Sequence, residues 1–337
     1  MHITIAERLH PYSHTPGTYV VLPSSSLRFQ IFPTRLRICN ISQTQPQVLI
    51  ELPVPIHGPV KEFTVQLDLE KAAIHVWGHD AQEYFRYHIF PGSTPFDFLI
   101  KIDKGLTSWE SSHIVSDISS RFPLWIDRLS LGNHKSQDWD MVKRRGNLEE
   151  IFPAWLRLGQ LVENPSSVAY EGTATLLQTC LQTPRLQLYQ AFRNLFDAAF
   201  EGILSPRLQD EQYQGFNLKP LTSDLSPLLL LTEGAKAIRS LFVRFQKDEI
   251  CILAHLPPEF HCGRFLQIKC LDLGLLDLEW SKKCVRRMIF HSHMDKEIHF
   301  QFPEKIERYR LNGQFHKAEK VVRVQKYQSY IFDCFQK

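Results

Sequence analysis

Two polar segments of the chain combine carboxylates with aromatic rings, as sites that cleave sugars do. The residues concerned are Asp138, Trp139 and Asp140 in HKSQDWDMVKRR, and Asp210, Glu211 and Tyr213 in LQDEQYQGF. Glycoside hydrolysis uses one carboxyl group as the acid and a second as the base or nucleophile. We therefore treat the four acids as catalytic candidates and the two aromatic residues as substrate-binding candidates.

Each segment also has a purely structural interpretation, which we favour. On a strand, Asp138 and Asp140 would share a face, and their like charges would raise the pKa of one of them. Before a helix, the same residues would lie at its positive end. The second segment has the composition of a surface turn that ends at Gly215. The catalytic interpretation requires both segments to line one cleft.

A third candidate segment is HVWGHDAQEYFRYH. His75, Trp77 and His79 alternate there, so on a strand they share one face. Trp77 is therefore a further substrate-binding candidate. A tight Gly-His-Asp turn between two strands explains the segment without a metal ion.

A second pair of alternating histidines, His291 and His293, lies in IFHSHMD. With Asp295 they would form a two-histidine, one-carboxylate metal site, although surface histidines are the simpler explanation. The chain contains no P-loop, no G-x-G-x-x-G and no G-x-S-x-G motif. We predict no metal and no cofactor.

Composition narrows the class of protein and its partners. A net charge of +3, with basic clusters only at residues 143–145 and 282–287, predicts no binding to nucleic acid. No apolar run approaches the roughly 20 residues that span a bilayer, so we predict no membrane partner. The N-terminus lacks a secretory signal pattern, and the seven cysteines have no paired spacing. A reducing, cytoplasmic location is the natural expectation.

The elements that must position these residues change along the chain. Residues 1–130 are short runs of alternating apolar and polar residues between Pro, Gly and Asn, which predicts an antiparallel β-sandwich domain. Residues 131–246 form a linker and a helical segment, and residues 247–337 return to strand patterns as a second sandwich domain. The predicted fold class is therefore mainly β with a helical insert (α+β).

Within the helical segment the boundaries follow from prolines and caps. Asn147 and Glu150 have the spacing of an N-cap and its capping-box partner, but Pro153 moves the expected helix start toward Phe152. Pro184 separates two further helices. A last helix is expected to run to Phe245, with its boundary near Gln246.

The segment ICILAHLPPEFHCGRFLQIKCLDLGLLDLEW resembles part of glycoside hydrolase families 65 and 95, which include α-L-fucosidases and disaccharide phosphorylases. The match is to the end of the catalytic domain and the C-terminal β-sandwich, and it covers residues 228–312. The residues that carry it are Ile252, Leu253, Leu256 and Pro257 in a strand and turn, Gly263, Leu266 to Cys270 in the next strand, and Leu276, Leu278 and Trp280 in the one after. Phe260 stands where the family usually has tryptophan.

This resemblance implies a β-supersandwich at the N-terminus, but it places no catalytic residue. The families carry their carboxylates in an (α/α)6 barrel of several hundred residues, whereas only three or four helices are expected here. The chain thus looks like a relative whose barrel is largely lost.

Two functions follow from these patterns. The first is a carbohydrate-associated protein that binds or hydrolyses a glycan. The alternative is a non-enzymatic scaffold, in which the aromatic helix LQLYQAFRNLFDAAFEGIL or a sandwich edge receives a protein partner. A pocket shared by Asp140 and Glu211 would favour the first function.

Overall fold

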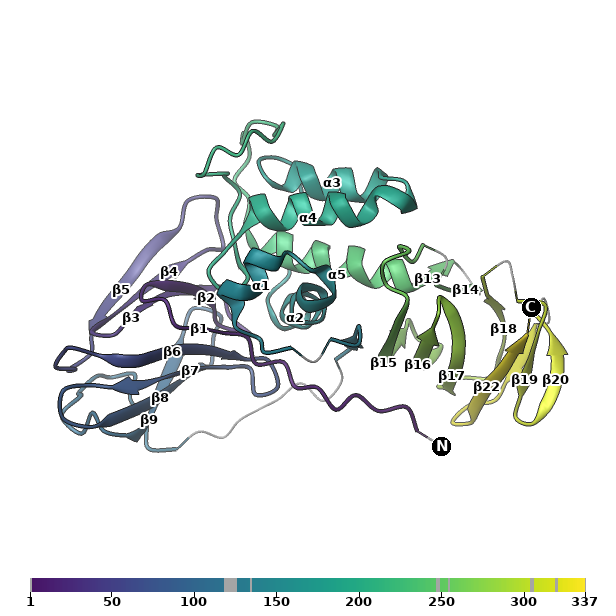
Figure 1. Cartoon of the computed structure of the whole chain (residues 1–337), viewed down its shortest axis with the longest axis horizontal. Coiled ribbons are helices and arrows are strands. Elements are labelled where there is room, and N and C mark those ends of the chain that lie inside the picture. The colour runs from purple at the N-terminus through teal and green to yellow at the C-terminus, as the bar shows by residue number, and fades with distance from the viewer. Residues whose placement is uncertain are drawn as a thin grey trace.

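The computed structural model of the chain describes residues 2–117, 126–133, 135–246, 249–253, 255–303, 306–318 and 321–336. These residues are mostly β, with 39% in strands and 19% in helices, and the strands form several antiparallel sheets. The predicted class, mainly β with helices inserted, is confirmed. Figure 1 shows one group of sheets at the N-terminal end, the helices in the middle and a second group of sheets at the C-terminal end.

The N-terminal sheets form a sandwich whose strands alternate as the sequence predicts. They comprise β1 (Tyr12–Ser13), β6 (Lys61–Asp68), β7 (Ala73–His79), β8 (Tyr84–Pro91) and β9 (Phe98–Lys104) in one sheet, and β2 (Thr18–Val21), β3 (Leu27–Phe32), β4 (Arg35–Asn40) and β5 (Gln47–Pro53) in the other. In β3, Leu27, Phe29 and Ile31 are buried while the residues between them are partly exposed. The rings of Phe29 and Phe98, one from each sheet, meet edge to face at 5.2 Å.

The helices pack around an aromatic core. They are α1 (Trp139–Arg145), α2 (Leu148–Leu161), α3 (Ala174–Gln182), α4 (Leu188–Ala199) and α5 (Leu228–Phe242), with a 3₁₀ turn (Arg185–Gln187) before α4 and a short ribbon of β11 (Phe200–Glu201) and β12 (Ser205–Pro206) after it. α2 and α5 approach closely at Gly159, where an added Cβ would lie 2.2 Å from the Leu231 carbonyl oxygen. Trp155 Nε1 donates a hydrogen bond to the Leu230 carbonyl at 3.1 Å.

Two predicted helix boundaries are wrong. α2 begins at Leu148, so Pro153 lies inside it and is buried against the core. Packing of the apolar face offsets the backbone hydrogen bond that proline cannot donate. The last helix ends at Phe242, because Val243–Gln246 pair with Glu249–Ile252 as neighbouring strands.

The C-terminal sheets form a second layered unit. They comprise β10 (Arg128–Ser130), β15 (Cys262–Cys270), β16 (Gly274–Ser281), β17 (Cys284–Ser292), β22 (Ser329–Gln336), β19 (Arg308–Leu311) and β20 (Gln314–Lys317) in one sheet, and β13 (Val243–Gln246), β14 (Glu249–Ile252), β18 (Lys296–Gln301) and β21 (Val322–Val324) in the other. Phe300 of the smaller sheet contacts Phe290 and Phe332 of the larger one. After the Pro-Pro corner, the Phe260 carbonyl accepts a hydrogen bond from Trp280 Nε1 at 3.0 Å.

Two segments from the N-terminal part of the chain cross to the C-terminal sheets. β10, which the sequence placed at the end of the first β-region, pairs with β15. Residues 2–11, the N-terminal strap, run beneath β15–β17 toward β1 (Figure 1). Ile3 of the strap packs on Leu266 and Ile289, and Arg264 Nη1 donates to the Thr4 carbonyl at 3.0 Å.

The Glu171 carboxylate is one of the groups that hold the long loop before α5 in place. Glu171 accepts hydrogen bonds from the backbone N–H groups and the hydroxyl groups of Thr222 and Ser223, at 2.7–3.0 Å. The two backbone bonds contribute most, and together the four lower the pKa of Glu171 to about 2. An ionised Glu171 is thus part of the folded loop.

We predict that Glu171→Gln lowers the free energy of unfolding more at pH 6 than at pH 3. A carboxyl group whose pKa is lowered on folding stabilises the fold above its unfolded pKa of about 4.3, and this contribution is lost as the pH falls toward 2. Urea unfolding at both pH values measures the difference. Glu110→Gln, at an exposed glutamate, is the control; an equal effect of Glu171→Gln at both pH values would contradict the prediction.

Candidate functional site

The first predicted acidic segment caps a helix. Asp138 is the N-cap of α1, and its side chain accepts hydrogen bonds from the backbone N–H groups of Asp140 and Met141 at 3.1 and 3.2 Å. The Asp140 carboxylate accepts from Ser13 Oγ at 2.7 Å and Thr15 Oγ1 at 3.0 Å. The two aspartates therefore take the structural role that we favoured from the sequence.

The electrostatics of this segment do not suit proton donation. Partial burial would raise the pKa of Asp140, but the hydrogen bonds from Ser13 and Thr15 and the charge of Lys143, 3.4 Å away, together lower it. Trp139 is 1% exposed and packs edge-on against Phe196, so its ring is not open to a ligand.

The second predicted segment is a turn beside the β11–β12 ribbon. Asp210 accepts hydrogen bonds from the backbone N–H groups of Gln212 and Gln214, at 3.3 and 2.8 Å. Glu211 is exposed, and Tyr213 is 91% exposed at the tip. Neither hollow described below is lined by these residues or by Asp138 and Asp140.

One residue between the two segments, Glu201, was not singled out from the sequence. Burial, followed by the charge of Glu211, raises its pKa, while Arg28 and Lys143 oppose the shift. Arg28 Nη1 lies 3.0 Å from the Glu201 carboxylate. Glu201 is thus held in an ion pair with Arg28. As catalytic residues, Asp138, Asp140, Asp210 and Glu211 stay predictions.

The histidine segments differ in their surroundings. Trp77 is partly exposed on β7 and has Thr64 and Arg86 as its cross-strand neighbours. His291 Nδ1 lies 2.8 Å from Ser329 Oγ on the next strand. Across the described part of the chain, no three His, Cys, Asp or Glu side chains come together in a way that could hold a metal ion.

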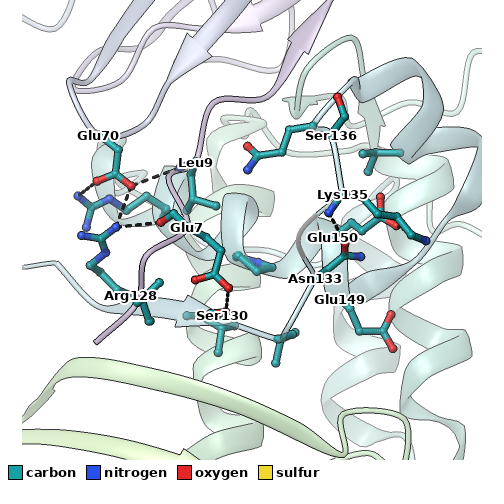
Figure 2. A pocket seen from close by; sticks show the side chains of 17 residues that line it. Glu7, Leu9, Glu70, Arg128, Ser130, Asn133, Lys135, Ser136, Glu149 and Glu150 are labelled. Carbon is teal, nitrogen blue, oxygen red and sulfur yellow. Dashed lines mark hydrogen bonds and ion pairs between the residues drawn. The ribbon is translucent and has the colours of Figure 1, made fainter. Parts of the chain in front are cut away.

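A concave site lies where the N-terminal strap, the β10–α1 linker, α2 and α4 meet. It has an inner cavity of about 40 Å³, shown in Figure 2, and an open outer hollow of about 600 Å³. Both are lined by Leu131, Asn133, Lys135 and Glu149. We call the outer part the seam hollow; Gly132, Asn147 and Tyr189 complete its lining.

The inner cavity is walled by paired charges. The Glu70 carboxylate accepts from Arg128 Nη2 at 3.1 Å and from the Leu9 backbone N–H at 3.3 Å (Figure 2). Ser130 Oγ donates to Glu7 Oε1 at 3.0 Å, also in Figure 2. Because these groups satisfy one another and the cavity has room for a few water molecules at most, the inner part is a structural seam.

The seam hollow is polar, and its side chains are held in place. The Tyr189 hydroxyl donates to Glu149 Oε2 at 3.1 Å and accepts from the Leu148 backbone N–H at 3.2 Å. Asn147 Nδ2 donates to Glu150 Oε1 at 3.3 Å, and Lys135 Nζ lies 3.5 Å from the same oxygen. The hollow thus presents amide, carboxylate and ammonium groups beside a phenol ring.

The Glu150 carboxylate behind this wall of the hollow is ionised. Its side chain is 5% exposed and forms a bidentate ion pair with Arg145. Burial would raise the pKa of Glu150, but hydrogen bonds from Arg145 and Asn133 and the charge of Arg145 lower it overall. A carboxyl group that is ionised at neutral pH binds donors and does not supply a proton.

Sequence reasoning missed this site. Its lining comes from residues 131–133, 135, 147, 149 and 189, which form no local motif. The capping-box pattern at Asn147 and Glu150 lies at the seam hollow, but it predicted only the start of a helix. In the structure, Asn147 is the N-cap, yet its side chain bonds to Glu150 and not to the backbone.

Comparisons with known proteins do not assign the chain to a family. A scan against protein-family models finds no match, and no curated protein matches significantly. Among the helices in the described residues, none is both long enough and apolar enough to cross a membrane.

We predict that Glu150→Gln lowers the free energy of unfolding at pH 7 by about 1–2 kcal/mol, because Arg145 loses its charged partner. The pKa of Glu150 is lowered on folding, so this loss should be present above pH 4 to 5 and should shrink as the pH falls below it. Urea unfolding at pH 7 and pH 3 measures it. Glu149→Gln is the matched control, since an amide oxygen can still accept from Tyr189. Equal losses for the two variants at pH 7 would contradict the prediction.

Proposed function

We propose that the protein is a non-catalytic carbohydrate-binding protein, a reduced relative of glycoside hydrolases, and that a glycan binds in the seam hollow. The observation that carries the proposal is the seam hollow itself. Its volume of about 600 Å³ falls within the roughly 300–1,000 Å³ of small-molecule sites. The resemblance of residues 228–312 to families 65 and 95 supports the same class of ligand.

The lining suits sugar hydroxyl groups. A hydroxyl both donates and accepts a hydrogen bond, so it needs donors and acceptors close together. Asn133 and Asn147 offer both, Lys135 donates and Glu149 accepts. The Tyr189 hydroxyl donates a hydrogen bond to Glu149, so both side chains are ordered before a ligand arrives. This order lowers the entropy cost of binding.

The hydrogen bonds and the ionised state of the carboxylates favour binding over hydrolysis. Asp138 and Asp210 hold backbone N–H groups, and the lowered pKa of Asp140 and of Glu150 keeps both ionised at neutral pH. A glycosidase needs a carboxylic acid that is still protonated at its working pH. These groups therefore support a binder.

One form of the scaffold alternative required an exposed aromatic helix; the other required a sandwich edge. In α4, Phe192 and Phe196 are 1% and 2% exposed and belong to the core between α2 and α5. The exposed apolar residues near this helix are Leu181 and Leu186, at the turn between α3 and α4. A protein partner stays a prediction, and the edge strand β5, where Val48 and Leu49 are exposed, is the form of it that the structure leaves open.

We predict that an Asn133→Ala, Glu149→Ala double variant loses at least tenfold in affinity for the glycan that the wild type binds. Each tenfold loss corresponds to about 1.4 kcal/mol, in the range of one or two hydrogen bonds to charged or ordered groups. A glycan array should identify the ligand, and isothermal titration calorimetry should measure the loss. Glu163→Ala, at an exposed position just after α2, is the control.

Three results would contradict the proposal. One is a wild type that binds no saccharide on the array or in a thermal-shift panel. Another is unchanged affinity in the double variant. The third is release of reducing sugar from the bound oligosaccharide, which would reject the non-catalytic part.

A further inference from the structure

The outer face of the sheet β1-β6-β7-β8-β9 has a composition unlike that of an ordinary solvated sheet. Two cross-strand rows meet on it, and directly opposed residues share a face. One row is Tyr12, Gln66, His75 and His88, and the other is Thr64, Trp77 and Arg86. We call these two rows the outer sheet face.

Strand alternation turns these side chains away from the opposite sheet, and all of them except the buried Thr64 are partly exposed. The residues between them, such as Val65, Val76 and Tyr87, are fully buried and face the opposite sheet of the sandwich. Trp77 is partly exposed, as are His75 and Arg86. A large flat ring is thus available at the centre of a polar surface.

The imidazole of His75, beside Trp77, can both donate and accept a hydrogen bond. The rings of His75 and His88 meet edge to face at 4.2 Å. Burial and then the neighbouring His88 lower the pKa of His75 to about 4, so its ring is neutral at pH 7, with one donor and one acceptor nitrogen. His88 Nδ1 is buried, and no hydrogen-bond partner for it lies within the described residues.

The charges on this face are paired among themselves. Asp103 lies 3.0 Å from Arg86 Nη2 and 2.9 Å from His88 Nε2. Asp68 is buried and accepts hydrogen bonds from the backbone N–H groups of Glu70 and Lys71 at 3.0 and 2.8 Å. A polyanion such as single-stranded nucleic acid gains its affinity from uncompensated cations. Paired charges suit a neutral ligand with hydroxyl groups instead.

We propose that the outer sheet face is a second binding surface, on which the apolar face of a neutral pyranose ring packs against Trp77 while its hydroxyl groups bond to His75 and Gln66. The inference rests on the ligand class of the proposed function, but it concerns a second surface whose residues differ from those of the seam hollow. A protein with both surfaces would bind an extended or branched glycan with avidity.

The test measures binding of neutral cello-, xylo-, malto- and chito-oligosaccharides by calorimetry and by indole N–H chemical shifts in NMR. Trp77→Ala should weaken binding of the oligosaccharide that perturbs the Trp77 signal by at least tenfold. The Asn133→Ala, Glu149→Ala variant should leave that binding unchanged, which separates the two surfaces. If Trp77→Ala does not unfold cooperatively, Trp77→Phe decides: its smaller ring should weaken binding at least threefold.

Unchanged affinity in the Trp77 variants would overturn the inference. So would a Trp77 signal that moves with a single-stranded oligonucleotide and with none of the saccharides. Loss of all saccharide binding in the seam variant, with Trp77→Ala behaving as wild type, would support the seam hollow alone and reject the second surface.

Discussion

The arrangement of the whole molecule depends on the buried charge of Asp127 at the start of β10. Its carboxylate lies 2.8 Å from Arg239 Nε of α5, and its backbone N–H donates to Gln160 Oε1 of α2 at 2.9 Å. The contact with Arg239 is an ion pair outside hydrogen-bond geometry. Burial raises the pKa of Asp127, and Arg239 offsets the shift only in part. Removing one partner of such a pair leaves a buried charge uncompensated, typically at about 3–5 kcal/mol.

Arg128, the residue after Asp127, connects β10 to the N-terminal sandwich. Arg128 reaches Glu70, on the turn after β6, and the carbonyl of Glu7 in the strap. Arg157 of α2 donates to the carbonyls of Leu69 and Ile126. The short strand β10 therefore joins both sets of sheets and the helices. The seam hollow lies where the linker that follows β10 passes between the sheets and the helices.

The aromatic residues of the chain serve two different purposes. In the helices they form a closed core, with Trp155 contacting Phe192 and Phe200, and this core holds α2 and α4 at the fixed spacing that the seam hollow needs. On the five-stranded sheet, Trp77 is instead at the surface among hydrogen-bonding groups. The carboxylates also have different roles. Asp138 and Asp210, which looked catalytic, stabilise a helix cap and a turn, while Glu149 lines the hollow.

The sequence by itself determined what depends on neighbours along the chain. Alternation in LRFQIF decides which side chains are buried, and Pro184 separates two helices, because each reflects local backbone geometry and burial on one face. The tertiary structure decided the rest. Pro153 stays inside a helix because packing outweighs propensity, Val243 leaves the helix because Ile252 pairs with it, and β10 joins a sheet whose next strand lies over a hundred residues away. The seam hollow belongs to this second group, since Asn133, Glu149 and Tyr189 come together only when three segments dock, and no spacing along the chain encodes that contact.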